Sequence, residues 1–162
     1  MSFRLKKLYL YKHPILGSTS LTFCNDEILK SNNEIYNTVI IGANGIGKSY
    51  ILKAIIEIFN FIHLRLSDSN DSNNLPYKFE LTYYINGDKC VLSSMPKDME
   101  VVGRGEQYNV YHYFNDKQTP LLDCKLPIRL IASSMTINDK FKAKSDDFYR
   151  YNGIRNENSP NT

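Results

Sequence analysis

Apolar and polar residues alternate over several short stretches of the chain, and a period of two predicts β-strands. The clearest alternation runs from Tyr77 to Ile85, where aromatic and aliphatic residues occupy every second position. Asn86-Gly87 follows, and this pair favours a tight hairpin turn because both residues tolerate positive φ. We therefore expect a returning strand over 90–93. Shorter apolar runs predict further strands over residues 3–11, 20–24, 35–41, 110–114 and 127–132.

Residues 49–66 follow a different period, because their apolar residues recur three and four positions apart. This spacing is typical of an α-helix. The polar residues of the segment form one narrow stripe on a helix that is otherwise buried. They are Lys53, Glu57, Asn60 and His63. We interpret His63 as a residue on the solvent side of the helix and not as a ligand.

Polar segments separate these elements and are expected to form the connections. The predicted loops and irregular segments are 12–19, 25–33 (with a helical turn), 67–74, 96–107 and 133–139. The last seven residues have no apolar content, so 151–162 is predicted to be a disordered tail or a point of truncation. Residues 1–150 are predicted to form one domain of ordinary size.

Composition narrows the class of protein. The chain is 42% hydrophobic and 23% charged, which excludes a collagen-like chain, a coiled coil and a wholly disordered chain. No apolar run is long enough to span a bilayer, and the basic N-terminal stretch lacks the apolar core of a secretory signal. We therefore expect a cytoplasmic protein without membrane contact. The net charge of +3 is weak for a dedicated nucleic-acid binder.

Cysteines and histidines give no spacing that indicates a metal or redox site. Cys24, Cys90 and Cys124 are far apart in the sequence, and their odd number argues against a disulfide framework. We interpret them as buried or inert thiols. His13 and His112 have no partners at metal-binding or catalytic spacing.

One motif carries chemistry. Residues 42–49 read Gly-Ala-Asn-Gly-Ile-Gly-Lys-Ser and match the phosphate-binding pattern G-x-x-x-x-G-K-[ST]. A predicted strand leads into the motif and a predicted helix leads out of it, which is the context in which such a loop occurs. The residues expected to contact a nucleotide here are Gly42, Ala43, Asn44, Gly45, Ile46, Gly47, Lys48, Ser49 and Tyr50.

Phosphate binding gives a physical reason for each residue type in the motif. The glycines permit unusual dihedrals and a close approach of the backbone to phosphates. The start of the following helix presents free N–H groups and the positive end of its dipole. Lys48 is the expected catalytic residue, because its charge faces the β- and γ-phosphates. Ser49 is expected to supply a hydroxyl ligand to Mg²⁺. The expected cofactors are ATP and Mg²⁺.

The finer form G-x-N-G-x-G-K-S, with the apolar residues after it, resembles the Walker A segment of ABC-type ATPases. The branch it most resembles is the chromosome-maintenance (SMC), RecF and OLD-like group. Strand pairs that precede the loop in that group are similar to Leu8-Tyr9-Leu10-Tyr11-Lys12 and Leu21-Thr22-Phe23. The segment 148–153 resembles a stretch in prokaryotic ABC-like ATPases of anti-phage defence systems.

The resemblance implies an α/β fold with α+β character: a P-loop NTPase N-terminal lobe with an antiparallel β layer and one long helix after the Walker A loop. It implies an ATP-binding module that couples ATP binding and hydrolysis to conformational change in DNA maintenance or phage defence. A homodimer or higher oligomer formed through a nucleotide sandwich, and a nuclease or effector partner, would follow. Lys12, Tyr11 and Phe23 are the residues by which such a lobe would hold adenine.

A basic cluster near the N-terminus raises DNA as a further partner. Arg4, Lys6, Lys7 and Lys12 form a basic cluster that could meet DNA backbone phosphates. The same residues could instead be the solvated face of a strand.

Several parts of an ABC-type ATPase are absent from the sequence. No apolar strand ends in Asp-Glu, and no serine-glycine-glycine signature occurs. Ser133, Ser134 and Met135 stand where the family would place a glutamine. We interpret the chain as the N-terminal lobe of a longer ATPase that is not competent alone. The alternatives are a complete small P-loop phosphotransferase and a non-hydrolysing nucleotide-binding assembly module.

Overall fold

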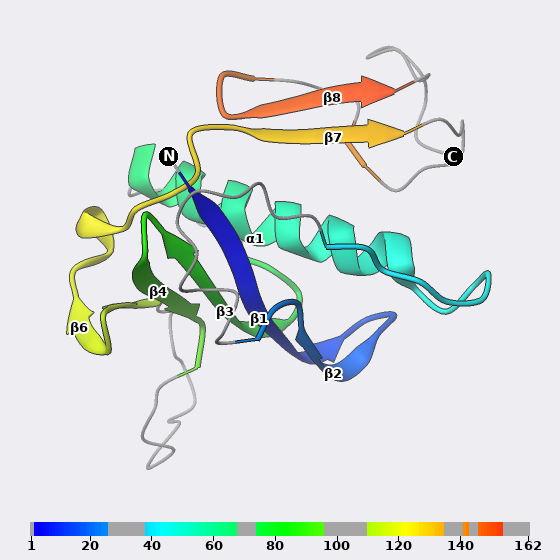
Figure 1. Cartoon of the computed structure of the whole chain (residues 1–162), viewed down its shortest axis with the longest axis horizontal. Coiled ribbons are helices and arrows are strands. Elements are labelled where there is room, and N and C mark those ends of the chain that lie inside the picture. The colour runs from blue at the N-terminus through cyan, green and yellow to red at the C-terminus, as the bar shows by residue number, and fades with distance from the viewer. Residues whose placement is uncertain are drawn as a thin grey trace. The chain divides into compact units, whose positions relative to one another are not determined.

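The computed structural model describes residues 2–25, 38–67, 74–95, 110–134, 141–142 and 146–153. Within these ranges the fold is α+β, with a six-stranded antiparallel sheet, one α-helix and a two-stranded parallel sheet (Figure 1). The chain divides into two compact units, Met1–Ile41 with Ser72–Leu126 and Gly42–Asp71 with Pro127–Thr162. The predicted antiparallel β layer and long helix are confirmed.

The first unit holds the six-stranded sheet, in the order β2-β1-β3-β4-β5-β6. Every pair of neighbouring strands is antiparallel. A short 3-10 turn, η2 (Leu121–Asp123), follows the last strand. The strands are β1 (Phe3–His13), β2 (Gly17–Thr22), β3 (Lys78–Ile85), β4 (Asp88–Ser93), β5 (Tyr111–Phe114) and β6 (Lys117–Thr119).

Two tight turns set the registers on one side of this sheet. Asn86 and Gly87 join β3 to β4 with φ of 52° and 89°, which confirms the predicted hairpin. Asn115 and Asp116 join β5 to β6 with φ of 47° and 66°. This second hairpin was not predicted, because Asn-Asp is a weaker turn signal than Asn-Gly and β6 has only three residues.

One face of the sheet forms the core of the first unit. The alternating residues of β3 that were predicted to be buried are buried, among them Phe79, Leu81 and Tyr83. A bulge at Lys6 brings residues of β1 onto the same face, because Leu5 pairs with Tyr83 and Leu8 pairs with Leu81. β4 and β5 continue this core with Cys90, Leu92 and His112, which are all at most 1% exposed.

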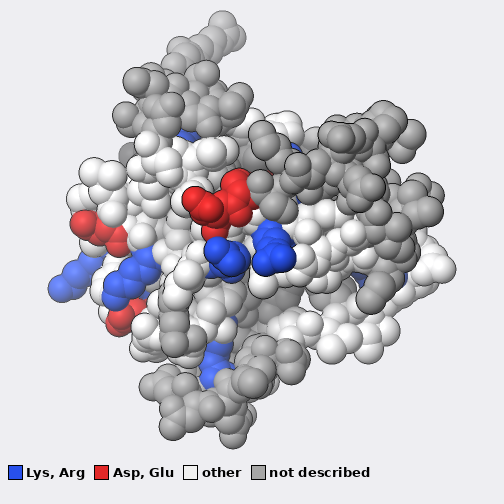
Figure 2. All heavy atoms as spheres, turned by 90° about the horizontal axis from the view of Figure 1, so that it is seen from above, with Lys and Arg blue, Asp and Glu red and all other residues white. Residues whose placement is uncertain are grey.

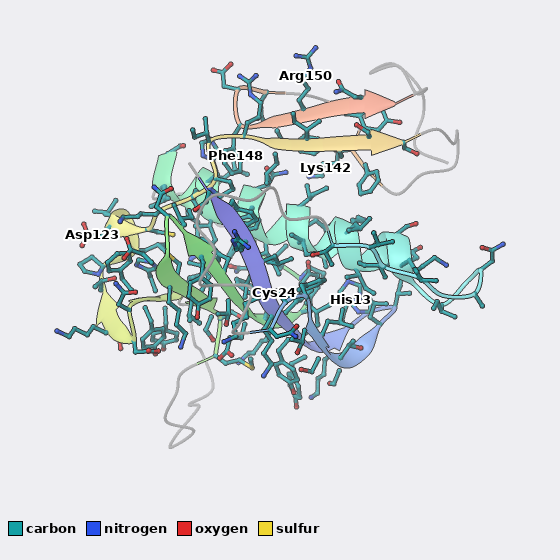
Figure 3. The ribbon with its side chains drawn as sticks, viewed as in Figure 1. His13, Cys24, Asp123, Lys142, Phe148 and Arg150 are labelled. Atoms are coloured by element: carbon teal, nitrogen blue, oxygen red, sulfur yellow. The ribbon has the colours of Figure 1, made fainter. Side chains whose placement is uncertain are left out.

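The second unit holds α1 (Lys48–Ser67), β7 (Leu130–Ser134) and β8 (Tyr149–Gly153). β7 and β8 are parallel (Figure 1). Ile56 of α1 packs against a buried cluster of Ala132, Tyr149 and Tyr151 on one face of this pair. Figure 3 shows Arg150, between the two buried tyrosines, pointing away from α1.

The direction of α1 follows from two contacts. His63, near the end of the helix, stacks on Phe148, which precedes β8, with ring centroids 4.2 Å apart. Ile56, two turns earlier, packs on the cluster that includes Tyr149 and Tyr151. The helix therefore runs opposite to β8, and its N-terminus lies at the carboxyl ends of the parallel strands, as Figure 1 shows.

Some sequence-based boundaries need correction. Residues 38–41 are not a strand in the structure, although the apolar run over 35–41 predicted one. Val39 and Ile41 are 75% and 88% exposed, so the neighbouring strand that would hold such a run is not formed by the described residues. β7 begins at Leu130 and ends within the predicted loop 133–139.

Other predictions meet the limits of the described ranges. β8 includes residues 151–153, which were predicted to belong to the tail, and the rest of that tail lies outside the described residues. The segments 25–33, 67–74 and 96–107 lie wholly or largely outside them as well. No described helix combines the length and apolar character that crossing a membrane requires.

The predicted polar stripe on α1 is not its most exposed side. Lys53, Glu57, Asn60 and His63 are all half-buried. Leu52 and Leu64 are 43% and 48% exposed. The interpretation of His63 as a solvent-side residue is therefore wrong, because its ring is covered on one side by Phe148.

Candidate functional site

The glycine-rich loop before α1 has the backbone that its sequence demands. Gly45 and Gly47 take φ of 86° and 95°, a region that L side chains rarely adopt. A Cβ at Gly42 would overlap the Cδ1 atom of Ile46, but this is the end of an exposed side chain that can turn aside. Gly45 and Gly47 are therefore the two glycines that the backbone of this loop requires.

Lys48 closes the loop on itself. Its Nζ donates hydrogen bonds to the carbonyl oxygens of Gly42 and Ala43, at 2.6 Å and 2.7 Å. An ammonium has three N–H donors, and these two carbonyls account for two of them. The charged end of Lys48 therefore lies over the first residues of the loop and not out in solvent along the helix.

The start of α1 supplies the rest of the site. The N–H groups of Tyr50 and Ile51 both bond to the Gly47 carbonyl, at 2.9 Å and 3.1 Å, so the helical pattern begins within the loop. The first turn of α1 carries no acidic residue. The N–H groups of a first helical turn lack partners within the helix, and the dipole there is positive, so this end favours an anion.

The remaining predicted contacts in the loop differ in exposure. Asn44, Ile46 and Ser49 are exposed, and Tyr50 is half-buried. The hydroxyl of Ser49 belongs to the second residue of α1, beside Lys48. This hydroxyl oxygen fits Mg²⁺ in its chemistry, because that ion prefers oxygen ligands and retains several waters. No group of three or more His, Cys, Asp or Glu residues that could hold a metal occurs among the described residues.

The loop lies at the edge of the second unit where a ligand is expected. In open α/β sheets, ligands bind outside the carboxyl ends of parallel strands. α1 begins on the side toward which β7 and β8 point (Figure 1). Ser133 and Ser134 end β7 on that same side, whereas Met135 lies outside the described residues.

Lys12 belongs to the first unit and the loop to the second, so its contact with a nucleotide stays a prediction. Its backbone is unusual for a lysine, with φ of 53°, and its N–H bonds to the Ser18 hydroxyl at 3.3 Å. Its ammonium lies 5.2 Å from the centre of the Tyr11 ring. Tyr11 is 37% exposed.

The basic residues of β1 do not form one solvated face. Arg4 is only 5% exposed, which contradicts its assignment to an open basic cluster. Lys6 lies at the bulge with its ammonium 5.8 Å from the centre of the Tyr84 ring. The shift in register at Lys6 puts Arg4 and Lys7 on one face of the sheet, since they pair with Tyr84 and Thr82, and of these two only Arg4 is buried. On the face drawn in Figure 2, blue basic and red acidic side chains are interspersed.

The structure brings together two cysteines that sequence spacing had not connected. The Tyr83 hydroxyl lies 3.4 Å from the Cys124 Sγ atom, and Tyr83 pairs directly with Cys90 across β3 and β4. Both cysteines belong to the first unit. No sequence signal pointed to this cluster, because β4 and the segment after η2 meet only through the folding of the sheet.

Comparison with protein families, curated proteins and solved structures found nothing similar to this chain.

Proposed function

We propose that residues 42–49 bind the phosphates of ATP with Mg²⁺, and that the chain is the ATP-binding N-terminal lobe of an ABC-type ATPase. The main support is the arrangement of Lys48 at the start of α1. Its ammonium folds back over the loop and hydrogen-bonds the Gly42 and Ala43 carbonyls. A motif of this sequence without that geometry would be a glycine-rich turn. The combination of loop backbone, lysine and helix start is what phosphate binding requires.

The arrangement of elements supports the finer part of this proposal. The six-stranded antiparallel sheet corresponds to the β layer expected for such a lobe. The parallel sheet has only two strands among the described residues. Parallel sheets are usually larger and covered on both faces. Ile131 of β7 is 61% exposed. These features support a lobe that works with further structure from a longer chain.

The chain's own residues would act by binding and positioning. Amide N–H groups of the loop would hold phosphate oxygens, and the Lys48 ammonium would leave the two carbonyls to meet the β- and γ-phosphates. Ser49 would supply a hydroxyl ligand for Mg²⁺, which neutralises phosphate charge when bound.

Hydrolysis needs groups that this sequence lacks. A carboxylate that polarises water and charge stabilisation at the γ-phosphate are required for rapid turnover. We therefore place the chemistry in a nucleotide-sandwich dimer of the longer protein, coupled to DNA maintenance or phage defence. A complete small phosphotransferase and a non-hydrolysing assembly module remain the competing functions, and the same loop would bind nucleotide in each.

Thermal unfolding with and without nucleotide tests the site. A ligand that binds only the folded state at about 100 times its Kd stabilises by about 2.7 kcal/mol. For a chain of this size we expect a rise in Tm of about 5–10 °C with ATP and Mg²⁺. Lys48→Ala should lose most of this rise, because it removes the charge that faces the phosphates.

The matched control is Lys53→Ala, which removes a lysine from the same helix. Lys53 pairs with Glu57 at 3.5 Å, and both side chains are partly exposed, so its loss should leave the nucleotide effect intact. Equal rises in Tm for the wild type and Lys48→Ala would overturn the assignment of the site. An equal loss of the rise in both variants would indicate non-specific charge attraction.

A further inference from the structure

A buried tyrosine in the first unit is shared by two thiols. The Tyr83 hydroxyl donates to the Lys125 carbonyl at 2.8 Å and lies 3.4 Å from the Cys124 Sγ atom. Tyr83 also pairs directly with Cys90 across β3 and β4. Tyr83 itself is fully buried. Both cysteines therefore lie beside the same buried tyrosine, Cys90 at its backbone and Cys124 at its hydroxyl.

The register of the sheet explains how the thiols meet. Tyr83 on β3 pairs directly with Cys90 on β4, and directly opposed residues project their side chains on the same face. Cys124 comes from the segment that follows η2 and crosses that face. The ammonium of Lys125 bonds to Asp88 at 3.0 Å and holds this segment to the start of β4.

The two thiols differ in their access to solvent. Cys90 is fully buried, whereas Cys124 is partly exposed. Burial raises the pKa of each thiol to about 11, so both are protonated at neutral pH. A protonated thiol reacts slowly because the thiolate is the nucleophile, and the rate should rise with pH.

We propose that Cys90 and Cys124 form an oxidisable pair that closes to an intramolecular disulfide by exchange with a small disulfide such as glutathione disulfide. Cys124 reacts first because it is the more exposed of the two residues. The pair links β4 to the segment after η2, and it is independent of nucleotide binding.

The exchange balances in two steps. The Cys124 thiol loses its proton, and its sulfur attacks glutathione disulfide to form a mixed disulfide and release one glutathione thiolate. The Cys90 sulfur, after losing its proton, attacks the Cys124 sulfur of the mixed disulfide and releases the second glutathione thiolate. The two thiolates take up the two protons, so two glutathione molecules are produced and the protein loses two hydrogens.

Closure requires the two cysteines to approach each other. A disulfide needs Cα atoms about 4.4–6.8 Å apart, so the segment that carries Cys124 must be able to settle onto β4. That segment follows η2 in an extended conformation, with φ of −65° and ψ of 125° at Cys124. The Tyr83 hydroxyl would lose the Cys124 thiol on closure and keep its hydrogen bond to the Lys125 carbonyl.

Mass spectrometry of the folded chain treated with glutathione disulfide at mildly alkaline pH tests the proposal. The wild type should lose two hydrogens and yield a Cys90–Cys124 linked peptide that reduction separates. Cys90→Ser should stop at a glutathione adduct on Cys124, and Cys124→Ser should form no link. Cys24→Ser is the matched control, since Cys24 is buried and bonds to the Leu5 carbonyl on β1.

If a serine variant fails to fold, the products formed by the wild type still decide the test. A stable glutathione adduct on Cys124 with Cys90 still free would overturn the proposal, as would a link through Cys24. A Cys90–Cys124 link that appears only in urea would also overturn it. A linked wild type should show a higher Tm than the reduced chain, and a reductant should reverse the rise.

Discussion

At the scale of single residues, the candidate site depends on backbone conformations that only glycine adopts easily. Gly45 has φ of 86°, and an added Cβ there would meet no atom within 4 Å. A substitution at this position is therefore opposed by backbone strain and not by a clash. The same is true of Gly17 at the start of β2, which has φ of 63° and equally open surroundings.

This pair of glycines gives a matched prediction. Gly45→Ala and Gly17→Ala should each lower stability by about 1–2 kcal/mol, because an L side chain is disfavoured at positive φ. Only Gly45→Ala should also reduce the rise in Tm with ATP and Mg²⁺, since only that residue lies in the phosphate loop. Thermal unfolding of both variants with and without nucleotide measures the two effects. A reduced nucleotide effect in Gly17→Ala as well would argue against a site confined to the loop.

At the scale of elements, the β5–β6 hairpin contains a buried polar pair. His112 on β5 is 1% exposed, and its Nδ1 atom lies 2.8 Å from the Thr119 hydroxyl on β6. Its Nε2 atom has no hydrogen-bond partner among the described residues. Burial lowers the pKa of His112, although the nearby Pro120 carbonyl and Asp123 oppose the shift. The imidazole is therefore held in its neutral form by the sheet core.

Because the pKa of His112 is lower in the folded chain, the unfolded chain takes up the proton first as the pH falls. Its contribution to stability is therefore present above the ordinary value of 6.5 and is lost as the pH falls below it. Tm should fall between about pH 7.5 and about pH 5.5, and His112→Gln should flatten this fall. Thermal unfolding across this range is the measurement.

The loss of stability at more acidic pH has a separate origin. Asn115 and then Lys125 hold the pKa of Asp88 below its ordinary value, so the contribution of Asp88 is lost only at more acidic pH. The window near neutral pH is therefore free of this carboxylate. An unchanged slope in His112→Gln would contradict the assignment of this pH dependence to His112.

At the scale of the whole molecule, the sequence contains a binding loop without the acidic groups that hydrolysis requires. We expect residues 1–162 to bind ATP but to release phosphate at background rate, because no apolar strand ends in an acidic pair that could polarise water. Steady-state phosphate release, with Lys48→Ala as the blank, tests this expectation. Lysine-dependent turnover at or above about 1 s⁻¹ would contradict it and favour the complete-enzyme alternative.

Local sequence determined those parts of the protein that depend on neighbouring residues alone. The Asn86-Gly87 turn, the alternating strand before it and the helix after the loop are present with boundaries close to those predicted. The phosphate-loop motif places three glycines and a lysine within seven residues, and its positive φ values and short Lys48 contacts arise within that segment. Dihedral preferences and helical periodicity act over a few residues, so these features could be predicted from local sequence.

Tertiary structure decided what depends on distant pairing. Whether an apolar run becomes a strand depends on a neighbour, and among the described residues 38–41 have none, although their composition favours a strand. Packing buried Arg4, one residue of the predicted basic cluster, and Phe148 covered a histidine predicted to face solvent. Cys90 and Cys124 meet at Tyr83 because three segments cross one face of the sheet. Contacts between residues this far apart depend on strand register and packing, which local sequence patterns do not encode.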